Sequence, residues 1–552
     1  MGEEVTVREG RATLYFASKK GVFYNPPQIP NRDLSVLALQ QFAQMWEAEP
    51  AKKKTPPGRS LRQGGASKDG EVPACGAVSA VEGAEAASRE SCVQGSGEKG
   101  GARQAEEREH GGKGVVDKEG GKGKEGEGSG ARRGLRVLDA LSASGLRALR
   151  YSLEVPGLRE VVANDVDPCA VATMRSNFEK NGVADAIISH VGDATALLYA
   201  SRPPASERFD VVDLDPYGTA APFLDAAVQA VSEGGMLMVT CTDMAVLAGT
   251  YPEACFAKYG AYPQKGKHCH EQALRILLAC IDGHAARHGR YITPLLSMHI
   301  NFYVRIFVRV YSGKSAVKLS PTKVSYMYQC AGCDTFTLQP VARVVDRGNL
   351  EKVTAGAGPP VPQNCEHCGQ VHHVGGPIWS APIHDTEFVA ALLRRLQEPG
   401  AEHAYGAHKR LVGMLTLCAE ELPDVPLFLN LSQMCSTLHL PIPQLLPVHS
   451  AIRRAGYRVS RSHTDPMAIK TDAPRRALWD VLRCWAKQPE CIEQTSKRKT
   501  ELSPTSPAAA ILGVEPSLQA DFRPLPEIQQ LLARKDASGS KAGKFFPTPT
   551  DR

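Results

Sequence analysis

One short segment combines residue types that could bring an amino group to reaction. Residues 211–214 are strand-like, and Asp215, Pro216, Tyr217 and Gly218 follow them. The exocyclic amine of a nucleobase is a poor nucleophile, because its lone pair is delocalised into the ring. An enzyme that acts on it must accept hydrogen bonds from its N–H groups and hold the ring still. A carboxylate, a carbonyl fixed by proline and an aromatic ring supply these functions, so Asp215, Pro216 and Tyr217 are the candidate catalytic residues.

Two other interpretations of this segment exist. Asp215 could simply cap an ordinary turn against which Tyr217 packs. The run Asp213-Leu214-Asp215 also resembles the D-x-D metal motif of glycosyltransferases. The metal interpretation is disfavoured because strand side chains alternate between faces, so Asp213 should point into the sheet with its neighbours rather than at a ligand.

Acidic residues at successive strand ends indicate a cofactor that contains a nucleoside. The small-residue turn 139–145 leaves one predicted strand and opens a helix, where backbone N–H groups can meet a polar ligand. Asp165 ends the next predicted strand and could accept hydrogen bonds from ribose hydroxyls. Asp193, followed by Ala194, ends the third predicted strand and could accept a hydrogen bond from the adenine amino group. These residues leave the identity of the cofactor open.

Four cysteines have the spacing of a closed metal site. Cys330 and Cys333 form one C-x2-C pair, and Cys365 and Cys368 form another. Paired knuckles of this kind predict a structural Zn²⁺ bound by four thiolates, which leaves no open position for catalysis. His367, His372 and His373 are possible substitutes for one ligand. The run 268–271, His-Cys-His-Glu, is better explained as a helix start than as a second metal cluster.

A basic region near the C-terminal end could bind nucleic acid. Residues 441–499 carry 12 Lys+Arg against 5 Asp+Glu, a difference of +7 that exceeds the net charge of +6 of the whole chain. A solvated basic surface is the alternative. The predicted phosphate-binding face comprises Arg453, Arg454, Arg458, Arg461, His463 and Lys470.

The elements that must position these residues follow an α/β pattern. Apolar runs at 136–139, 160–165, 186–191, 209–215 and 236–241 predict buried strands, and helical stretches such as 145–153 and 221–231 separate them. This alternation predicts a parallel, doubly wound sheet. The runs 295–300 and 302–311 follow so closely that an antiparallel hairpin should close one sheet edge. A helix at 445–455 followed by strands at 457–463 and 467–471 suggests a small winged-helix-like module. Residues 31–33 are expected to cap a helix over 34–46, and further helices are predicted at 385–397, 407–421 and 474–487.

Composition divides the chain into segments and excludes several classes of protein. The near balance of 65 Lys+Arg against 59 Asp+Glu excludes a polybasic chain, and 15 cysteines in 552 residues are too few for a disulfide-stapled scaffold. The sequence contains no run of 18 apolar residues, so no membrane span is predicted.

Residues 51–134 hold 20 of the 50 glycines and no Phe, Trp, Tyr or Ile, which predicts a disordered insertion. The segments expected are 1–50, packing on the catalytic domain; the insertion 51–134; a catalytic α/β domain, 135–322; a zinc-binding segment, 323–380; a C-terminal mixed α/β domain that binds nucleic acid, 381–495; and a disordered tail, 496–552.

With these residues assembled, the chain resembles the tRNA (guanine-26 N2) dimethyltransferase family. Besides the four cysteines, the matching stretches are 23–26 with 31–35, 141–148, 164–165, 192–194, 213–218 and 460–466. The resemblance implies a class I methyltransferase-like fold, S-adenosylmethionine as cofactor and tRNA as substrate. It also implies Arg32, Arg147, Asp165, Asp193 and Ala194 as cofactor-binding residues and Asp215 as the catalytic acceptor beside Pro216 and Tyr217. The long insertion, and Tyr217 where the family also uses Phe, depart from the family pattern.

Two rival functions remain at this point. An amino-methyltransferase acting on adenine in another nucleic acid would use a similar Asp-Pro-aromatic segment. A zinc-dependent tRNA-binding protein without activity could retain the cofactor fold. An acidic start disfavours an organelle transit peptide, so we expect the nucleus or the cytoplasm, and a monomer.

Overall fold

The computed structural model describes residues 5–16, 24–49, 134–202, 208–346, 348, 351–496 and 502–526. The predicted insertion, 51–134, lies outside the described residues except for Gly134. The described residues fall within one compact unit. None of the described helices has both the length and the apolar character needed to cross a membrane.

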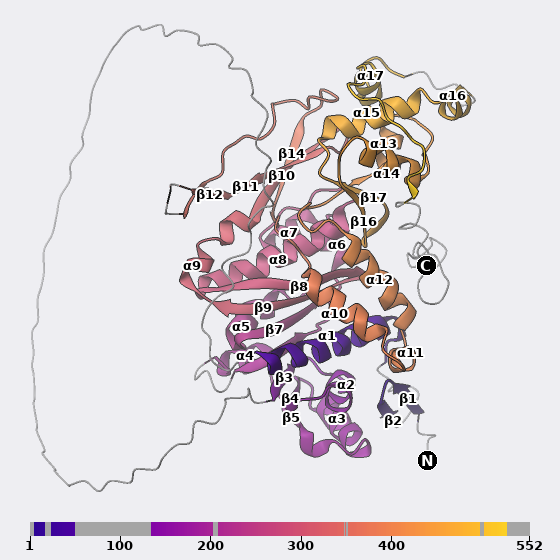
Figure 1. Ribbon diagram of the computed structural model, residues 1–552. Coiled ribbons are helices and arrows are strands. Elements are labelled where there is room, and N and C mark those ends of the chain that lie inside the picture. Colours follow the sequence, from indigo (N-terminus) through magenta and orange to yellow (C-terminus); the bar gives the residue numbers. More distant parts are fainter. Residues whose placement is uncertain are drawn as a thin grey trace, which may run out of the picture. The chain divides into compact units, whose positions relative to one another are not determined.

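A seven-stranded sheet lies at the centre of this unit (Figure 1). Its strand order is β5-β4-β3-β6-β7-β9-β8, with the first five strands parallel and β9 antiparallel to both of its neighbours. The predicted doubly wound sheet and the hairpin at its edge are thus confirmed. The order reverses between β3 and β6, and open α/β sheets bind ligands at such a point. The strands are β3 Leu135–Asp139, β4 Leu158–Asp165, β5 Ile187–Val191, β6 Phe209–Leu214, β7 Val231–Cys241, β8 Arg290–Ile300 and β9 Tyr303–Ser312.

Helices cover both faces of the sheet because neighbouring strand residues are apolar on both sides. Val137 belongs to one hydrophobic core and Leu138 to the other. Helices on the Leu138 side are α4 Ala194–Ala200, α5 Ala221–Ala230, α6 Met244–Leu247, α7 Pro252–Tyr259 and α8 Cys269–Arg287. Helices on the Val137 side are α1 Ile29–Ala48, α2 Leu146–Glu154, α3 Pro168–Lys180, α10 Thr386–Leu396, α11 Ala401–Ala404 and α12 His408–Glu420.

The N-terminal segment is integrated into this core. The hairpin of β1 (Val5–Glu9) and β2 (Ala12–Phe16) precedes α1, which begins at Ile29 and so is longer than the helix predicted from residue 34. Pro30 occupies its first turn, where a missing N–H costs nothing. Residues 31–33, predicted to cap the helix, are therefore inside it and buried.

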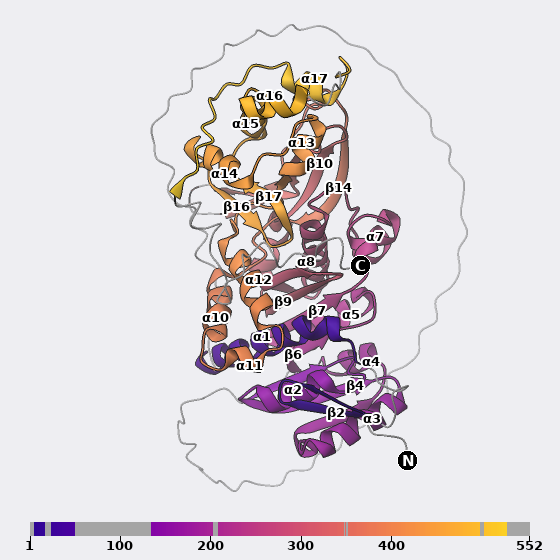
Figure 2. The same cartoon turned by 90° about the vertical axis from the view of Figure 1, so that its right-hand side faces the viewer.

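Two three-stranded sheets follow the central sheet in sequence, besides the two-stranded sheet of β12 and β13, and Figure 2 shows the C-terminal helices gathered near the three-stranded sheets. The first, in order β11-β10-β14, carries the cysteine pairs. The second, β15-β17-β16, contains the predicted helix-then-hairpin arrangement, α14 before β16 and β17. The bounds are α9 Lys314–Val317, β10 Val324–Cys330, β11 Phe336–Pro340, β12 Ala342–Asp346, β13 Glu351–Ala355, β14 His372–Trp379, β15 Leu429–Asn430, α13 Leu431–Thr437, α14 Leu445–Arg454, β16 Val459–Ser462, β17 Asp465–Thr471, α15 Arg475–Ala486 and α16 Pro489–Ser496.

The expectation of a disordered tail from residue 496 is wrong for 502–526. These residues form α17 (Pro507–Leu512) and an extended stretch that packs on the C-terminal helices. Ile511 is fully buried, and its carbonyl accepts a hydrogen bond from Arg483 Nε at 2.7 Å. The Ser/Pro-rich composition did not predict this order, because a few buried apolar residues are enough to hold the segment against the C-terminal helices. Residues 527–552 lie outside the described part.

Candidate active site and metal centre

Asp215 lies directly after β6, at the carboxyl edge of the central sheet. Arg147 in the first turn of α2 donates to its Oδ2 from Nε at 2.9 Å and from Nη2 at 2.5 Å. The Asp215 side chain is 22% exposed and that of Arg147 is 8% exposed. Burial alone would raise the pKa of Asp215, but the charges of Arg147 and Arg305 and hydrogen bonds leave it below its usual value. Asp215 is therefore a fixed carboxylate at neutral pH.

A buried polar network supports this pair from within the sheet. Asp213 is fully buried, as its alternation in β6 predicted, and binds Arg305 Nη1 at 2.7 Å and the Tyr151 hydroxyl at 2.5 Å. Arg305 and Arg147 both donate to Ser35 Oγ, at 2.8 and 3.0 Å. The network leaves the D-x-D metal interpretation without a second exposed carboxylate.

Asp139 at the end of β3 is the third carboxyl group of this region. It is 1% exposed; Ser142 donates to its Oδ2 at 2.5 Å, and its Oδ1 has no hydrogen-bond partner within the described structure. Burial and the charge of Asp213 raise its pKa to about 7. Asp139 therefore holds a proton under conditions in which Asp215 does not.

The predicted cofactor-binding acids Asp165 and Asp193 lie side by side at the ends of β4 and β5. The N–H of Gly192 donates to the carbonyl of Asp165 at 3.0 Å, which links the two loops. Asp165 Oδ2 accepts from the backbone N–H of Ala143 at 2.9 Å, so the small-residue turn after β3 faces the same point. Asp193 is exposed and caps α4, whose first residue, Ala194, is buried.

The turn after β3 needs small residues for steric reasons. Ala143 and Gly145 both have positive φ, 47° and 81°. A Cβ on Gly145 would come within 2.7 Å of the Phe178 ring. Since such a turn can let a ligand approach backbone N–H groups closely, its geometry fits a nucleoside cofactor held between the turn and Asp165.

Arg32, the remaining predicted cofactor-binding residue, contacts the N-terminal hairpin. Its guanidinium binds Glu9 with contacts of 2.7 and 2.5 Å and is 7% exposed. Glu9 also binds Arg150, which pairs with Asp33 at 2.7 Å. Arg32 is thus part of an ion network that joins the β1-β2 hairpin to α1 and α2, and its predicted contact with the cofactor stays a prediction.

Pro216 and Tyr217 face in different directions. Pro216 is buried, whereas Tyr217 is 82% exposed. Burial and the charges of Asp215 and Asp165 raise the pKa of Tyr217. Gly218 donates to Thr242 Oγ1 at 2.9 Å, so the loop is tied to the end of β7. Tyr217 is therefore an exposed aromatic at the mouth of the site.

Sequence reasoning missed several members of this site: Ser35, Tyr151 and Arg305. An arginine within an apolar strand is the signal that could have found Arg305, because a buried guanidinium needs a carboxylate.

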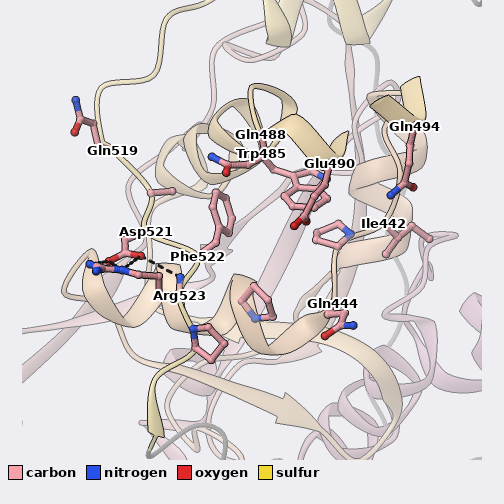
Figure 3. Close-up of a pocket in the computed structure, with 14 residues that line it drawn as sticks. Ile442, Gln444, Trp485, Gln488, Glu490, Gln494, Gln519, Asp521, Phe522 and Arg523 are labelled. Carbon is pink, nitrogen blue, oxygen red and sulfur yellow. Dashed lines mark hydrogen bonds and ion pairs between the residues drawn. The ribbon is translucent and has the colours of Figure 1, made fainter. Parts of the chain in front are cut away.

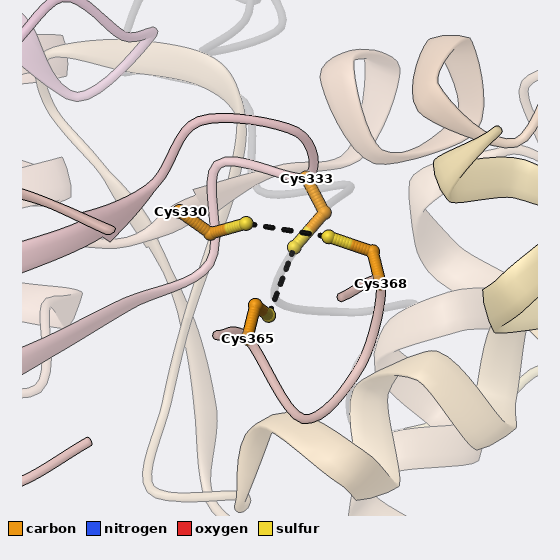
Figure 4. Close-up of side chains that lie close together, drawn as sticks. All are labelled: Cys330, Cys333, Cys365 and Cys368. Atoms are coloured by element: carbon orange, nitrogen blue, oxygen red, sulfur yellow. Dashed lines mark hydrogen bonds between the residues drawn. The ribbon is translucent and has the colours of Figure 1, made fainter. Parts of the chain in front are cut away.

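The four predicted metal ligands converge (Figure 4). Their Sγ atoms lie within 4.8 Å of one another, with Cys330–Cys368 at 3.3 Å and Cys333–Cys365 at 3.7 Å. Four thiolates at about 2.3 Å from Zn²⁺ in a tetrahedron would be about 3.8 Å apart. All four are at most 5% exposed. This cluster is consistent with one structural Zn²⁺, and the nearby histidines are not part of it.

Most of the predicted phosphate-binding face is already paired or buried. Arg458 binds Asp424 and Asp472, and Arg461 binds Glu420 at 3.0 Å. Lys470 and His463 are buried against carboxylates. Arg453 and Arg454 are exposed, and Arg454 lies 3.5 Å from Asp521. The excess positive charge of 441–499 thus mainly serves internal ion pairs in the described structure.

An open groove also lies on the C-terminal helices (Figure 3). Its volume is about 1010 Å³, and Trp485, Phe522 and Ile442 contribute to its wall. None of the predicted catalytic, cofactor-binding or metal-ligating residues lines it, so it is separate from the site at the sheet edge.

Comparison with known proteins extends these observations. Residues 2–483 match the family model described as N2,N2-dimethylguanosine tRNA methyltransferase. The chain is 46% identical over 519 residues to tRNA (guanine(26)-N(2))-dimethyltransferase from Mus musculus, covering 94% of this chain and 72% of the relative. It is 42% identical over 560 residues to tRNA (guanine(26)-N(2))-dimethyltransferase 1 from Arabidopsis thaliana, covering 100% and 87%. A relative from Saccharomyces cerevisiae, 33% identical over 92% of this chain and 83% of its own length, is named as mitochondrial.

A solved structure shares the fold. Trm1 from Pyrococcus horikoshii, in complex with S-adenosyl-L-methionine, superposes with a TM-score of 0.61 and 24% identity over 86% of this chain and 99% of that chain.

Proposed function

This chain belongs to the N2,N2-dimethylguanosine tRNA methyltransferase family, and we infer that it transfers methyl groups from S-adenosylmethionine to the exocyclic N2 of guanine 26 in tRNA, giving dimethylguanosine. The observation that carries this inference within the chain is the fixed carboxylate of Asp215 beside Pro216 and an exposed Tyr217. The rival function on adenine receives no support from the relatives.

The cofactor fits the edge formed by the turn 139–145, Asp165 and Asp193. S-Adenosylmethionine supplies the methyl group as an electrophilic carbon on a positively charged sulfur. Asp165 presents a carboxylate already oriented by the Ala143 N–H, and Asp193 presents an exposed one. These two side chains would hold the ribose and the adenine, as their places at strand ends indicate.

Asp215 would orient the guanine amine. Its carboxylate would accept a hydrogen bond from one N–H of N2, and the carbonyl of Pro216 would accept a hydrogen bond from the other. The Tyr217 ring would stack on the base. These contacts pull the nitrogen lone pair out of conjugation and aim it at the methyl carbon. Arg147 keeps Asp215 ionised, so Asp215 acts first as an acceptor. As the nitrogen–methyl bond forms and the methyl–sulfur bond breaks, the nitrogen would become strongly acidic, and Asp215 would receive its proton or pass it to water.

A guanine inside folded tRNA must leave its stack to reach this site. Unstacking costs a few kcal/mol, which contacts with the rest of the tRNA would offset. Because the product must be methylated again, the pocket must also accept the monomethyl base.

Replacement of Asp215 tests the role of this residue. Asp215→Asn and Asp215→Ala should lower the rate of dimethylguanosine formation on an unmodified transcript by about 10² to 10⁴-fold. Binding of S-adenosylmethionine, measured by calorimetry, should persist. Asp185→Asn, which changes an exposed acid outside the site, is the matched control. Unchanged nucleoside yields for both variants would refute the role of Asp215, and methylated adenosine as the product would refute the substrate.

We further propose that the protein acts as a monomer in the nucleus or cytoplasm. The candidate active site and the cysteine cluster lie in one compact unit, and this arrangement supports a self-sufficient chain. Light scattering and microscopy of a tagged chain test this proposal, and a dimer or a mitochondrial signal would contradict it.

A further inference from the structure

The turn between β8 and β9 presents an aromatic side chain to solvent. Ile300 pairs with Tyr303, so the turn consists of Asn301 and Phe302 alone. Asn301 has a φ of 54°, a conformation that asparagine tolerates in tight turns. Phe302 is 43% exposed, and its ring lies edge-on to that of buried Tyr303 at 5.4 Å. The short turn and the Tyr303 support hold an exposed phenyl ring in one place.

This turn lies at the same sheet edge as Asp215. In the pairing of β7 with β9, Cys241 is opposite Val304, which places the next pair, Thr242 and Tyr303, at the carboxyl end of β7. Thr242 is the residue that binds Gly218 of the catalytic loop. Phe302 and Tyr217 are thus exposed aromatics from two adjoining loops.

Arg410 in the first turn of α12 stands beside this turn with an unbalanced charge. Its Nη2 donates to Asn301 Oδ1, and its Nε is buried without a hydrogen-bond partner in the described structure. No carboxylate forms an ion pair with it among the described residues, and burial lowers its pKa. A partly buried guanidinium without a counterion is costly, so an anion bound there would be strongly favoured.

Tyr303 connects Arg410 to the active site. Burial raises the pKa of Tyr303, and the charges of Arg410, Arg147 and Asp215 all act on its hydroxyl. The charges of Arg410 and Asp215 therefore both act on the buried Tyr303 hydroxyl, which has no hydrogen-bond partner in the described structure. Lys409, exposed on the same helix turn, adds a second positive charge.

We propose that Arg410 binds a backbone phosphate of the substrate RNA next to the target guanosine, while Phe302 stacks in the gap that the flipped base leaves. This proposal rests on the proposed function. It concerns an RNA strand rather than a free anion because the cation and the exposed ring adjoin one another at the mouth of the site. Arginine suits a phosphate by its forked donors, and a phenyl ring stacks on any base.

Removal of the charge tests the phosphate contact. Arg410→Gln should raise the KM for tRNA about tenfold and reduce the slope of log KM against log salt concentration by about 1, as expected for one lost phosphate contact. Arg410→Lys should keep the slope, since the charge remains. Arg394→Gln, which removes an exposed arginine on α10, is the matched control and should match the wild type.

Removal of the ring tests the wedge. Phe302→Ala should lower kcat on folded tRNA about tenfold. A transcript with an abasic site in place of the nucleotide that stacks on the target guanosine needs no wedge, and the variant should regain most of its rate on it. Since Phe302 is a turn residue, this variant should fold even if Arg410→Gln does not.

The outcomes separate this proposal from the proposed function. Wild-type protein that makes no dimethylguanosine overturns the function itself. Active wild type, with an unchanged salt slope in Arg410→Gln or a Phe302→Ala rate that the abasic transcript does not restore, overturns the phosphate contact or the wedge respectively. Loss of S-adenosylmethionine binding in folded Arg410→Gln and Arg410→Lys would mean that the arginine supports the cofactor site instead, and would also overturn the phosphate contact.

Discussion

Three carboxyl groups and two guanidinium groups lie together at the ends of β3 and β6. Asp139, Asp213 and Asp215 face Arg147 and Arg305. If all five side chains were ionised, three negative charges would face two positive charges, so the buried site would have a net charge of −1. The arginines contact Asp213 and Asp215, and the remaining acid is the one that keeps its proton. The pKa of Asp139, about 7, is the consequence.

This proton should give the free energy of unfolding a measurable pH dependence. The folded pKa of Asp139 lies above its usual value of 3.8, so between about pH 4 and pH 7 the folded chain holds a proton that the unfolded chain has released. The contribution of Asp139 to stability therefore falls as pH rises through that window, by about 1.4 kcal/mol per pH unit. Asp139→Asn cannot ionise and lacks this slope.

Urea unfolding of both proteins at pH 5, 6, 7 and 8 measures the effect. The stability of Asp139→Asn relative to the wild type should improve between pH 5 and 7 by about 2 to 3 kcal/mol and then level off. A difference between the two proteins that stays constant with pH would show that Asp139 is ionised in the folded chain.

Among single residues, the acids at strand ends could be predicted better than the buried residues that hold them in place. Asp215, Asp165 and Asp193 could be found because each follows an apolar run, and the strand ends then bring them to one edge. The apolar run around Arg305 signals a buried guanidinium that needs a carboxylate, but which carboxylate could not be predicted, since its partner Asp213 is 92 residues away and only the fold joins them. For Arg32, a motif match cannot reveal that Glu9 binds its guanidinium, and its contact with the cofactor stays a prediction.

Among the elements, the knuckles of the cysteine cluster hold the β10-β11-β14 sheet against α15. Trp479 of α15 donates to Thr335 Oγ1 at 3.3 Å, and Thr335 contacts Cys333 Sγ at 3.2 Å. The metal site is therefore expected to stabilise both the sheet and its contact with the C-terminal helices.

Cys365→Ser should remove Zn²⁺ and loosen this part of the chain. Purified wild type should contain one Zn²⁺ per chain by elemental analysis, and Cys365→Ser or chelation should lose it with a fall in Tm, since structural zinc contributes directly to folding. Cys169→Ser, which changes an exposed cysteine, should keep both. Full zinc content in Cys365→Ser would contradict the four-cysteine site.

Elements with strong periodicity could be predicted closely, and short ones could not. Helices α12 and α15 lie within one residue of the predicted ranges 407–421 and 474–487, because their apolar faces are clear. The two-residue β15 and the six-residue α17 are too short for a helix or strand period to stand out from loops. They form because a neighbouring surface is already there.

Considered as a whole, the molecule joins its C-terminal part to the catalytic sheet by a buried ion network. Lys470 of β17 is 1% exposed and lies 2.9 Å from Glu271 of α8 and 3.4 Å from Glu421 after α12. Glu271 also binds Arg275 at 2.8 Å. A lysine that composition assigned to an RNA-binding face is instead an internal counterion.

Lys470→Met should therefore lower the free energy of unfolding by about 3 to 5 kcal/mol, because two buried carboxylates lose a counterion. Lys487→Met is the control: Lys487 is exposed and pairs with the exposed Glu515, so its loss should cost under about 1 kcal/mol. Denaturant unfolding of both variants measures this. Equal small losses would mean that Lys470 is not a buried counterion in solution.

The same reasoning applies to the N-terminal segment, which shares a core with residues from beyond the insertion. Phe42 and Leu37 of α1 are fully buried in one cluster with Leu149 of α2 and Phe307 of β9. Arg309 of β9 also binds Glu49 at the end of α1. A chain that starts at residue 134 would expose the apolar surface that α1 covers, so we expect it to be insoluble.

Co-expression of residues 1–49 with 134–552 should restore a soluble complex that binds S-adenosylmethionine, because the two pieces carry both sides of the described contacts of α1 and their separation costs closure entropy. Size-exclusion chromatography and calorimetry of the co-purified pieces measure the result. A soluble, cooperatively unfolding 134–552 chain on its own would contradict the argument, since it would mean that α1 is not needed to cover the sheet. The insertion would then be a tether to an accessory element rather than an interruption within one fold.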